Sequence, residues 1–288
     1  MSVTDTEKTA TSSPATPRPK PARKRPAART VLLFVLPPLA VLVLVIAIWQ
    51  LAISVFGVPT YLMPAPSDVL AAVGGSLGDL VQPTLVTMEE AYGGFALAAV
   101  VGFAVAFVMA RWTVAERGLY PYMVLLQTIP IIAIAPILVV WLGPGAATNT
   151  VVAAMIAVFP VTANTLTGLK STDRNLVQLF AMAGATKRYE MVVLRIPYAL
   201  PYALTGLRIA AGSSVIGAIV GEFVAGIGGG QGGLGYVITS TAQQLLMARL
   251  FVAVVAASCV SLLLFGIVRV VEVVALRRWH ESAMSNED

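Results

Sequence analysis

The sequence predicts an all-α integral membrane protein with about six transmembrane helices and a cytoplasmic loop that carries two short helices. Hydrophobic residues make up 58% of the 288 residues, charged residues make up 11%, and the mean hydropathy is +0.85. Soluble domains contain roughly 45–50% apolar and roughly 25% charged residues. Because so few charges cannot cover so much apolar surface in water, lipid must be the solvent for most of the chain.

Two polar tails flank the predicted transmembrane domain, which covers residues 31–276. Residues 1–30 are rich in Thr, Ser, Pro, Ala, Lys and Arg. This composition buries too little apolar surface to offset the entropy of ordering, so we expect a disordered basic tail. The apolar run at 31–55 is longer than that of a signal peptide and has no small-residue cleavage site close behind it. We expect the cell to retain it as the first membrane helix, and residues 277–288 to form a second short tail.

The transmembrane domain contains about six apolar stretches of the length that a spanning helix needs, about 20 residues. The predicted spans are Val31–Val55, Glu90–Ala110, Leu119–Leu142, Thr150–Leu169, Leu200–Val220 and Leu250–Ala275. Several contain proline, which membrane helices tolerate because neighbouring helices can satisfy the freed carbonyl groups.

The basic residues predict the orientation of these spans. They gather in the N-terminal tail, in the second and fourth loops and in the C-terminal tail. The alternate segments 56–89, 143–149 and 221–249 hold a single basic residue, Arg249. Because cytoplasmic segments carry an excess of Lys and Arg, both termini are predicted to lie in the cytoplasm. The expected location is therefore the cytoplasmic membrane of a bacterium, crossed several times.

Two of the non-cytoplasmic segments are expected to do more than connect spans. Ser67 and Asp68 follow a proline-rich stretch and could cap a short interfacial helix over residues 69–80. The segment 221–236 is very rich in glycine and could dip into the membrane where protein or a water-filled cavity covers it.

The longest cytoplasmic loop, residues 170–197, predicts two short helices hinged at a glycine. Asp173 can cap a helix that starts near Asn175, and Gly184 interrupts that helix. A second amphipathic piece runs from Thr186 to Leu194. Pro197 is then expected to open the next span, where a missing N–H costs nothing.

This loop resembles the coupling motif of ATP-binding-cassette import permeases. Gly184 stands at the family's glycine position, and Ile196-Pro197 stands at its Leu-Pro position. The chain departs from the family at the start of the motif, where Gln178-Leu179-Phe180 replaces the usual Glu-Ala-Ala. The departure removes an acidic contact to the ATPase but leaves the hinge in place.

Further segments resemble the nitrate, sulfonate and taurine branch of binding-protein-dependent transport permeases, from about Tyr61 to His280. They are Met63–Val69, Thr128–Gly143, Thr205–Arg208, Gly232–Ile238 and Glu272–His280. Gly217–Val224 is similar to members that carry vitamin precursors, such as hydroxymethylpyrimidine or riboflavin.

The resemblance implies a permease subunit that moves a small solute and has a core importer fold at about 88–275. Its implied partners are a cytoplasmic ATP-binding subunit, an extracytoplasmic solute-binding protein, a second permease copy and membrane lipid. The chain has no G-x-x-x-x-G-K-[ST] motif, so we expect no cofactor here, with ATP and Mg on the ATPase. With one histidine, His280, we expect no catalytic or metal site. The net charge of +5 does not indicate nucleic-acid binding, because the basic residues sit in tails and short loops.

Two sets of candidate site residues follow from the resemblance and from polar groups inside the spans. The ATPase-docking residues are expected to be Gln178, Ala181, Gly184, Ala185, Lys187, Arg188, Tyr189 and Pro197. The candidates for lining the translocation path are Tyr122, Gln127, Thr128, Asn164, Thr205, Arg208 and Glu222. Helix–helix hydrogen bonding is an alternative role for the uncharged polar groups. Arg208 could instead extend to the cytoplasmic interface or pair within the bundle, and Glu222 could be an interfacial carboxylate or an anchor for the glycine-rich loop.

The sequence leaves two other functions open. A stand-alone secondary transporter or channel would need coupling ions and usually buried carboxylates or inverted repeats. No repeat is obvious, and Glu89, Glu90, Glu222 and Glu272 are expected at span ends. A membrane-embedded enzyme would need a catalytic constellation that we do not find.

Arg269 and Glu272 are spaced as a helical ion pair.

Overall fold

The computed structural model describes residues 28–226 and 232–284, and these residues form helices and connecting segments without a strand. The predicted all-α class is therefore confirmed. Most of the predicted N-terminal tail and part of the predicted glycine-rich loop lie outside the described residues.

The chain forms two units, residues 1–49 and residues 50–288, and each is described by itself. In the first unit, the described residues belong to α1 (Ala28–Phe56), which continues across the boundary. This helix is apolar over most of its length and contains Pro37 and Pro38.

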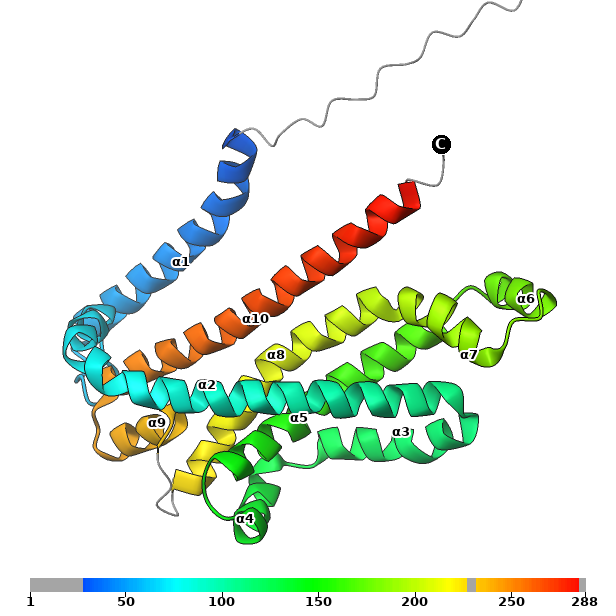
Figure 1. Cartoon of the computed structure of the whole chain (residues 1–288). Coiled ribbons are helices and arrows are strands. Elements are labelled where there is room, and N and C mark those ends of the chain that lie inside the picture. Colours follow the sequence, from blue (N-terminus) through cyan, green and yellow to red (C-terminus); the bar gives the residue numbers. More distant parts are fainter. Residues whose placement is uncertain (1–27, 227–231, 285–288) are drawn as a thin grey trace, which may run out of the picture. The chain divides into compact units, whose positions relative to one another are not determined.

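The second unit is a bundle of long helices joined by shorter ones (Figure 1). Its elements are α2 (Pro66–Arg111), α3 (Thr113–Thr128), α4 (Ile131–Leu142), α5 (Ala146–Lys170), α6 (Arg174–Met182), α7 (Lys187–Glu190), the π-helical turn η1 (Met191–Arg195), α8 (Ile196–Gly226), α9 (Leu234–Gln243) and α10 (Met247–Met284). In the described part of the chain, five helices are long and apolar enough to cross a membrane, or six if the bent pair α3–α4 is one span. The prediction of about six spans is confirmed on this criterion.

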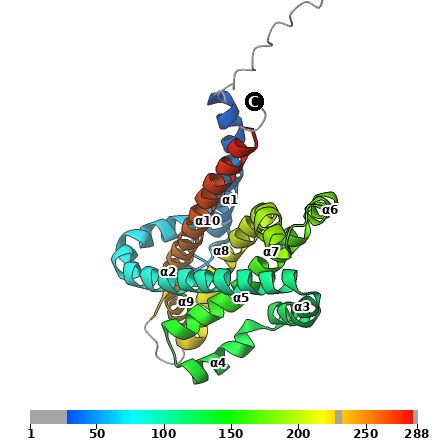
Figure 2. The same ribbon diagram turned by 45° about the vertical axis from the view of Figure 1, so that its right-hand side comes forward.

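Helix α2 joins two elements that the sequence predicted to be separate. The expected interfacial helix and the second span are one helix of 46 residues, which bends strongly in its first part (Figure 2). Pro83 lies inside this helix and can donate no hydrogen bond to the preceding turn, but it does not end the helix. The predicted cap is also corrected, because the helix already begins at Pro66. Asp68 lies in its first turn and accepts a hydrogen bond from the Ala65 N–H at 3.0 Å.

The predicted third span is broken in two. Helices α3 and α4 meet at Ile129 and Pro130 and bend by 99°. Ile129 is extended, as the residue before a proline tends to be, and Pro130 provides no N–H for a continuous helix. The predicted stretch Leu119–Leu142 therefore contains a sharp bend, because neighbouring helices do not restore the helix at this proline.

Helices α2, α5 and α8 pack closely through small residues in the core of the second unit, to which α9 and α10 also contribute buried side chains. On α2, a Cβ at Gly102 would lie 2.8 Å from the Cβ of Val161 on α5. On α8, a Cβ at Gly217 would lie 2.6 Å from the Cα of Ala153 on α5. Such close backbone approach is typical of helix packing in membranes. The predicted spans 150–169 and 200–220 fall within α5 and α8 and are confirmed.

The two ends of this core carry different short elements. Helices α6 and α7 and the turn between α2 and α3 lie at one end, whereas α4 and α9 lie at the other (Figure 1). Helix α10 packs against α2, α8 and α9 and contains the predicted last span. The connector between α5 and α8, residues 171–195, thus stands at the end of the bundle opposite α4 and α9.

Candidate functional site

The first half of the connector is a short helix with the predicted start. The carboxylate of Asp173 accepts a hydrogen bond from the Asn175 N–H at 2.8 Å and caps α6. This cap satisfies one of the N–H groups that the first turn leaves without a partner. The helix then presents Val177 and Ala181 to a pocket that is described below.

The hinge at Gly184 is a Schellman motif. Gly184 has φ of +72°, its N–H donates to the Ala181 carbonyl at 3.1 Å, and the Ala185 N–H donates to the Phe180 carbonyl at 3.0 Å. A Cβ at Gly184 would meet no atom within 4 Å, so the backbone conformation, and not lack of space, requires glycine. The predicted interruption of the helix is therefore confirmed, with a physical reason for the residue.

The second half of the connector runs without a break into the membrane helix that follows. The hydroxyl of Thr186 accepts a hydrogen bond from the Tyr189 N–H at 3.2 Å and caps α7. The π-helical turn η1 comes next, and the Ile196 N–H bonds to the Met191 carbonyl. The prediction that Pro197 opens the span was wrong, because α7, η1 and α8 follow one another directly. The wider π-turn directly before Pro197 accommodates a ring that would clash with a regular helix.

An aromatic contact holds the two halves of the connector together. The rings of Phe180 on α6 and Tyr189 on α7 are stacked, with centroids 6.2 Å apart and an angle of 28° between their planes. Such a pair contributes roughly 0.5–1.5 kcal/mol beyond the burial of its surface. Since it spans the Gly184 hinge, it favours one relative orientation of the two short helices.

Most of the expected docking residues are exposed on this connector. Gln178, Ala181, Gly184, Lys187, Arg188 and Tyr189 are exposed, whereas Ala185 and Pro197 are half-buried. The structure thus brings the set together on one protruding segment of the second unit.

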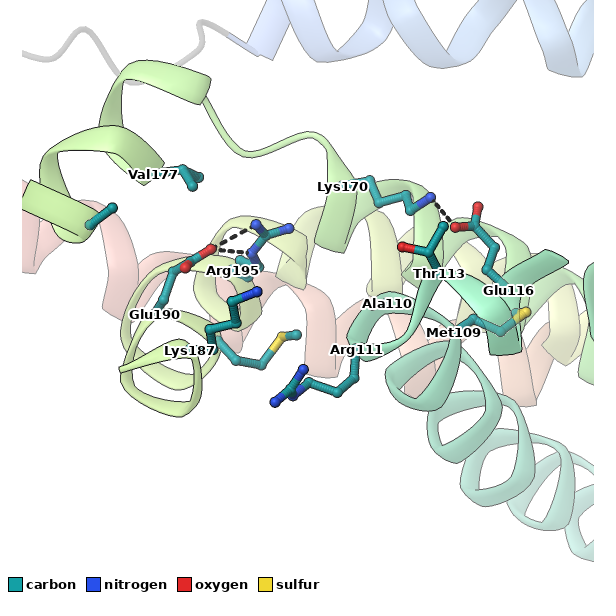
Figure 3. A pocket seen from close by; sticks show the side chains of 12 residues that line it. Met109, Ala110, Arg111, Thr113, Glu116, Lys170, Val177, Lys187, Glu190 and Arg195 are labelled. Carbon is teal, nitrogen blue, oxygen red and sulfur yellow. Dashed lines mark hydrogen bonds and ion pairs between the residues drawn. The ribbon is translucent and has the colours of Figure 1, made fainter. Parts of the chain in front are cut away.

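A charged pocket separates the connector from the corner between α2 and α3 (Figure 3). It has a volume of about 510 Å³ and is lined by residues from α2, α3, α5, α6, α7 and η1. Lys170 forms an ion pair with Glu116 at 2.5 Å, and Arg195 forms one with Glu190 at 2.7 Å. The first pair ties the end of α5 to α3, and the second links α7 to η1 within the connector. This pocket could not be predicted from the sequence, because its residues come from six separate elements.

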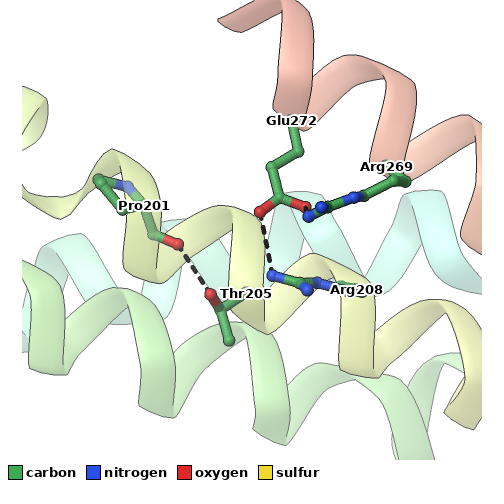
Figure 4. A network of polar contacts seen from close by, with 5 residues as sticks. All are labelled: Pro201, Thr205, Arg208, Arg269 and Glu272. Atoms are coloured by element: carbon green, nitrogen blue, oxygen red, sulfur yellow. Dashed lines mark hydrogen bonds and ion pairs between the residues drawn. The ribbon is translucent and has the colours of Figure 1, made fainter. Parts of the chain in front are cut away.

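The candidate path residue Arg208 is paired within the bundle (Figure 4). Glu272, which is only 7% exposed, accepts hydrogen bonds from Arg208 on α8 and from Arg269 on α10, each at 3.0 Å. The expected Arg269–Glu272 pair is confirmed. The hydroxyl of Thr205 donates to the Pro201 carbonyl of its own helix at 2.9 Å.

Two carboxylates that were expected at span ends are buried inside the bundle. Glu222 is 3% exposed and accepts a hydrogen bond from the Thr87 hydroxyl at 2.6 Å and another from the Gly235 N–H. Glu90 is 2% exposed, lies well inside α2, and accepts a hydrogen bond from the Asn149 amide at 2.9 Å. Glu222 lies in the last turns of α8, as expected for the end of a span, and its bond to the Gly235 N–H matches the alternative role of an anchor for the glycine-rich segment. The expectation for Glu90 was wrong, because α2 begins well before the apolar stretch that predicted the span.

The other candidates for the path lie on different elements. Tyr122, Gln127 and Thr128 are exposed on α3. Asn164 on α5 is half-buried and donates a hydrogen bond to the Pro160 carbonyl of its own helix at 2.8 Å. Arg208 and Glu222 are about four turns apart along α8. The structure therefore divides the set into an exposed group on α3 and a group that bonds within the bundle.

Comparison with known proteins identifies the class of molecule to which these elements belong. Residues 98–278, well over half of the chain, match the family model "Binding-protein-dependent transport system inner membrane component". The chain belongs to this family of permease subunits. The permease is therefore the membrane subunit of an ATP-binding-cassette importer for small solutes, and the ATPase is a separate subunit.

Three relatives are similar over most of the permease. The formylaminopyrimidine transport permease of Halalkalibacterium halodurans is 35% identical, over 84% of this chain and 95% of its own. The riboflavin transport system permease of Chloroflexus aurantiacus is 31% identical, over 89% and 96%. The putative aliphatic sulfonates transport permease of Bacillus subtilis is 27% identical, over 83% and 85%. The family resemblance inferred from the connector is thus confirmed. The alternative of a stand-alone secondary transporter or channel gives way to that of an importer permease.

Proposed function

We propose that the connector is the segment through which the permease docks on its ATPase, so that its end of the bundle faces the cytoplasm. The observation that carries the proposal is the hinged pair of capped helices around Gly184, which exposes a contiguous set of side chains and continues directly into α8. A force applied to α7 reaches α8 through an unbroken helical backbone. The excess of basic residues in the tails and in this connector supports the cytoplasmic orientation of this end and of both termini.

The cargo that we propose is a small nitrogen heterocycle. Formylaminopyrimidine and riboflavin are the solutes named for the two relatives with 35% and 31% identity. Aliphatic sulfonates are the second candidate class, because the sulfonate permeases are 27% and 26% identical. In either case the family implies that an extracytoplasmic binding protein delivers the solute.

The path would form between two copies of the permease. Three of the candidate path residues, Tyr122, Gln127 and Thr128, are exposed on α3 and are available to line it. Arg208 and Glu222 are bonded within the bundle, which supports a structural role for them. We therefore propose that α3 lines the path and that Arg208 and Glu222 stabilise the bundle.

A capture experiment in detergent tests the docking proposal. Wild-type permease should retain the candidate ATPase, and the complex should have the mass of two permeases with two ATPases. Gly184→Pro should abolish capture, because proline cannot adopt the positive φ and has no N–H for the Ala181 carbonyl. The charge-reversing pair Lys187→Glu with Arg188→Glu should weaken capture by at least tenfold.

The control is Gly118→Ala on α3, where the added Cβ would meet no atom within 4 Å. It should capture the ATPase as well as the wild type does. Equal capture by the connector variants, with all proteins monodisperse, would show that the ATPase docks elsewhere.

A further inference from the structure

The charged pocket contains more positive charge than its acidic residues neutralise. Its charged lining consists of Arg111, Lys170, Lys187 and Arg195 against Glu116 and Glu190. Both carboxylates are already engaged, by Lys170 and by Arg195.

Arg111 and Lys187 remain without an acidic partner among the residues that the structure describes. Arg111 lies over the ring of Trp112, with its guanidinium carbon 5.7 Å from the ring centroid. This contact orients the side chain but neutralises none of its charge. In Figure 3 the side chains of Arg111 and Lys187 extend from the α2 wall and the connector wall toward the space between them. A pocket with two uncompensated cations on facing walls favours an anion.

The level of the pocket relative to the membrane indicates the source of that anion. An exposed apolar stripe on α2, which includes Val100 and Val108, leads at helical spacing to Arg111. Trp112 follows and is 55% exposed. A basic residue and a tryptophan at the end of a lipid-facing stripe are typical of the level of the lipid headgroups.

The rest of the lining also suits a lipid. Met109, Val177 and Met191 give the pocket an apolar part beside its charges. A headgroup phosphate could reach the two cations while the glycerol and the first acyl carbons contact these side chains. A free phosphate would leave the apolar part in contact with water.

We propose that this pocket binds the phosphate of an anionic phospholipid, held by Arg111 and Lys187. Basic pockets between membrane helices on the cytoplasmic side are known to bind anionic headgroups. A lipid in this position joins the α2–α3 corner to the connector. Its binding therefore fixes the connector relative to the bundle. Resting on the docking function proposed above, this makes anionic lipid a requirement for full coupling.

The decisive variant is Arg111→Gln, because Arg111 lies outside the docking residues and Lys187 is among them. The purified permease is titrated with phosphatidylglycerol and, separately, with phosphatidylcholine, and bound lipid is counted by native mass spectrometry. Wild type should retain one phosphatidylglycerol in preference to phosphatidylcholine. Arg111→Gln should weaken its binding roughly fivefold, which corresponds to about 1 kcal/mol for one basic residue near an anionic surface.

Two controls keep the test specific. Arg117→Gln removes an exposed basic residue on α3 that does not line this pocket, and it should bind phosphatidylglycerol like the wild type. Arg111→Lys keeps the charge and should retain most of the binding. Equal binding by wild type and Arg111→Gln, or an equal loss in Arg117→Gln, would overturn the proposal.

A further arm separates the two sources of phosphate. Inorganic phosphate at millimolar concentration should not displace the bound phosphatidylglycerol. Displacement, with phosphate binding that depends on Arg111, would instead assign the pocket to a soluble anion and reject the lipid. The lipid count uses the permease without its ATPase, so a failure of ATPase docking leaves this test unaffected.

Discussion

At the scale of single residues, the Glu222 carboxylate links three helices inside the apolar bundle. It accepts hydrogen bonds from the Thr87 hydroxyl on α2 and from the Gly235 N–H on α9. Thr87 in turn accepts a hydrogen bond from the Leu234 N–H at 2.8 Å. The start of α9 is thus anchored to α2 and α8 by side chains and not by a cap of its own.

Glu222→Ala should destabilise the permease strongly. It leaves the Thr87 hydroxyl and the Gly235 N–H buried without an acceptor, at a cost of about 1–3 kcal/mol for each group. Glu222→Gln keeps one oxygen that can accept a hydrogen bond, so its cost in free energy of unfolding should be smaller. Thermal unfolding in detergent measures both effects as a decrease in Tm.

The matched control for this prediction is Glu89→Ala on α2, which removes an exposed carboxylate. Its Tm should stay close to that of the wild type. If Glu222→Ala unfolds at the wild-type temperature, the buried carboxylate does not anchor α9.

Residue roles could be predicted from the sequence where the reason is local. Asp173 was identified as a cap and Gly184 as a hinge because caps and positive φ angles depend on a few neighbouring residues. The burial of Glu90 and its bond to Asn149 could not be predicted, because the partner is 59 residues away. Its position beside Glu89, in a chain with few charges, was the only signal.

At the scale of helices, the close contact between α5 and α8 requires glycine at particular positions. Gly217→Ala should lower the free energy of unfolding by about 1–3 kcal/mol, because its Cβ would lie 2.6 Å from the Ala153 Cα, a backbone atom that cannot rotate away. The Tm in detergent should fall accordingly. Gly212→Ala provides a control on the same helix, since nothing lies within 4 Å of its Cβ position.

Gly212→Ala should be neutral or slightly stabilising, because alanine loses less backbone entropy in a helix than glycine. Equal Tm values for the two variants would mean that α5 and α8 are further apart than the structure places them.

Span positions were predictable because hydrophobic length is a property of the sequence itself. The bends and breaks within the spans were harder to predict. Pro83 lies inside α2 and does not end it, whereas Pro130 separates α3 from α4 with a bend of 99°. Pro197 follows a π-helical turn and interrupts nothing. A proline reveals that a helical hydrogen bond is missing, but the packing around it determines whether the helix bends, breaks or widens.

At the scale of the whole molecule, the permease is one part of an assembly whose chemistry lies elsewhere. Family membership assigns ATP hydrolysis to a separate subunit and implies delivery by a binding protein. The structure supplies what such a subunit must provide, which is a membrane bundle and an exposed connector that continues into one of its long helices. The class of the cargo was only partly predictable from sequence, since vitamin precursors and sulfonates both fitted the motifs.

Uptake by the assembled importer tests the proposed cargo. Cells that lack their own uptake systems, and that express the permease with its ATPase and binding protein, are given radiolabelled riboflavin, formylaminopyrimidine or an aliphatic sulfonate in separate assays. We expect accumulation of a heterocycle and not of the sulfonate, because the relatives named for heterocycles share more of this chain. Cells with the Gly184→Pro permease should accumulate none, since the ATPase cannot drive a permease that it does not hold. Uptake of the sulfonate alone would reassign the cargo while leaving the coupling mechanism intact, whereas uptake that persists in Gly184→Pro would refute the role of the connector.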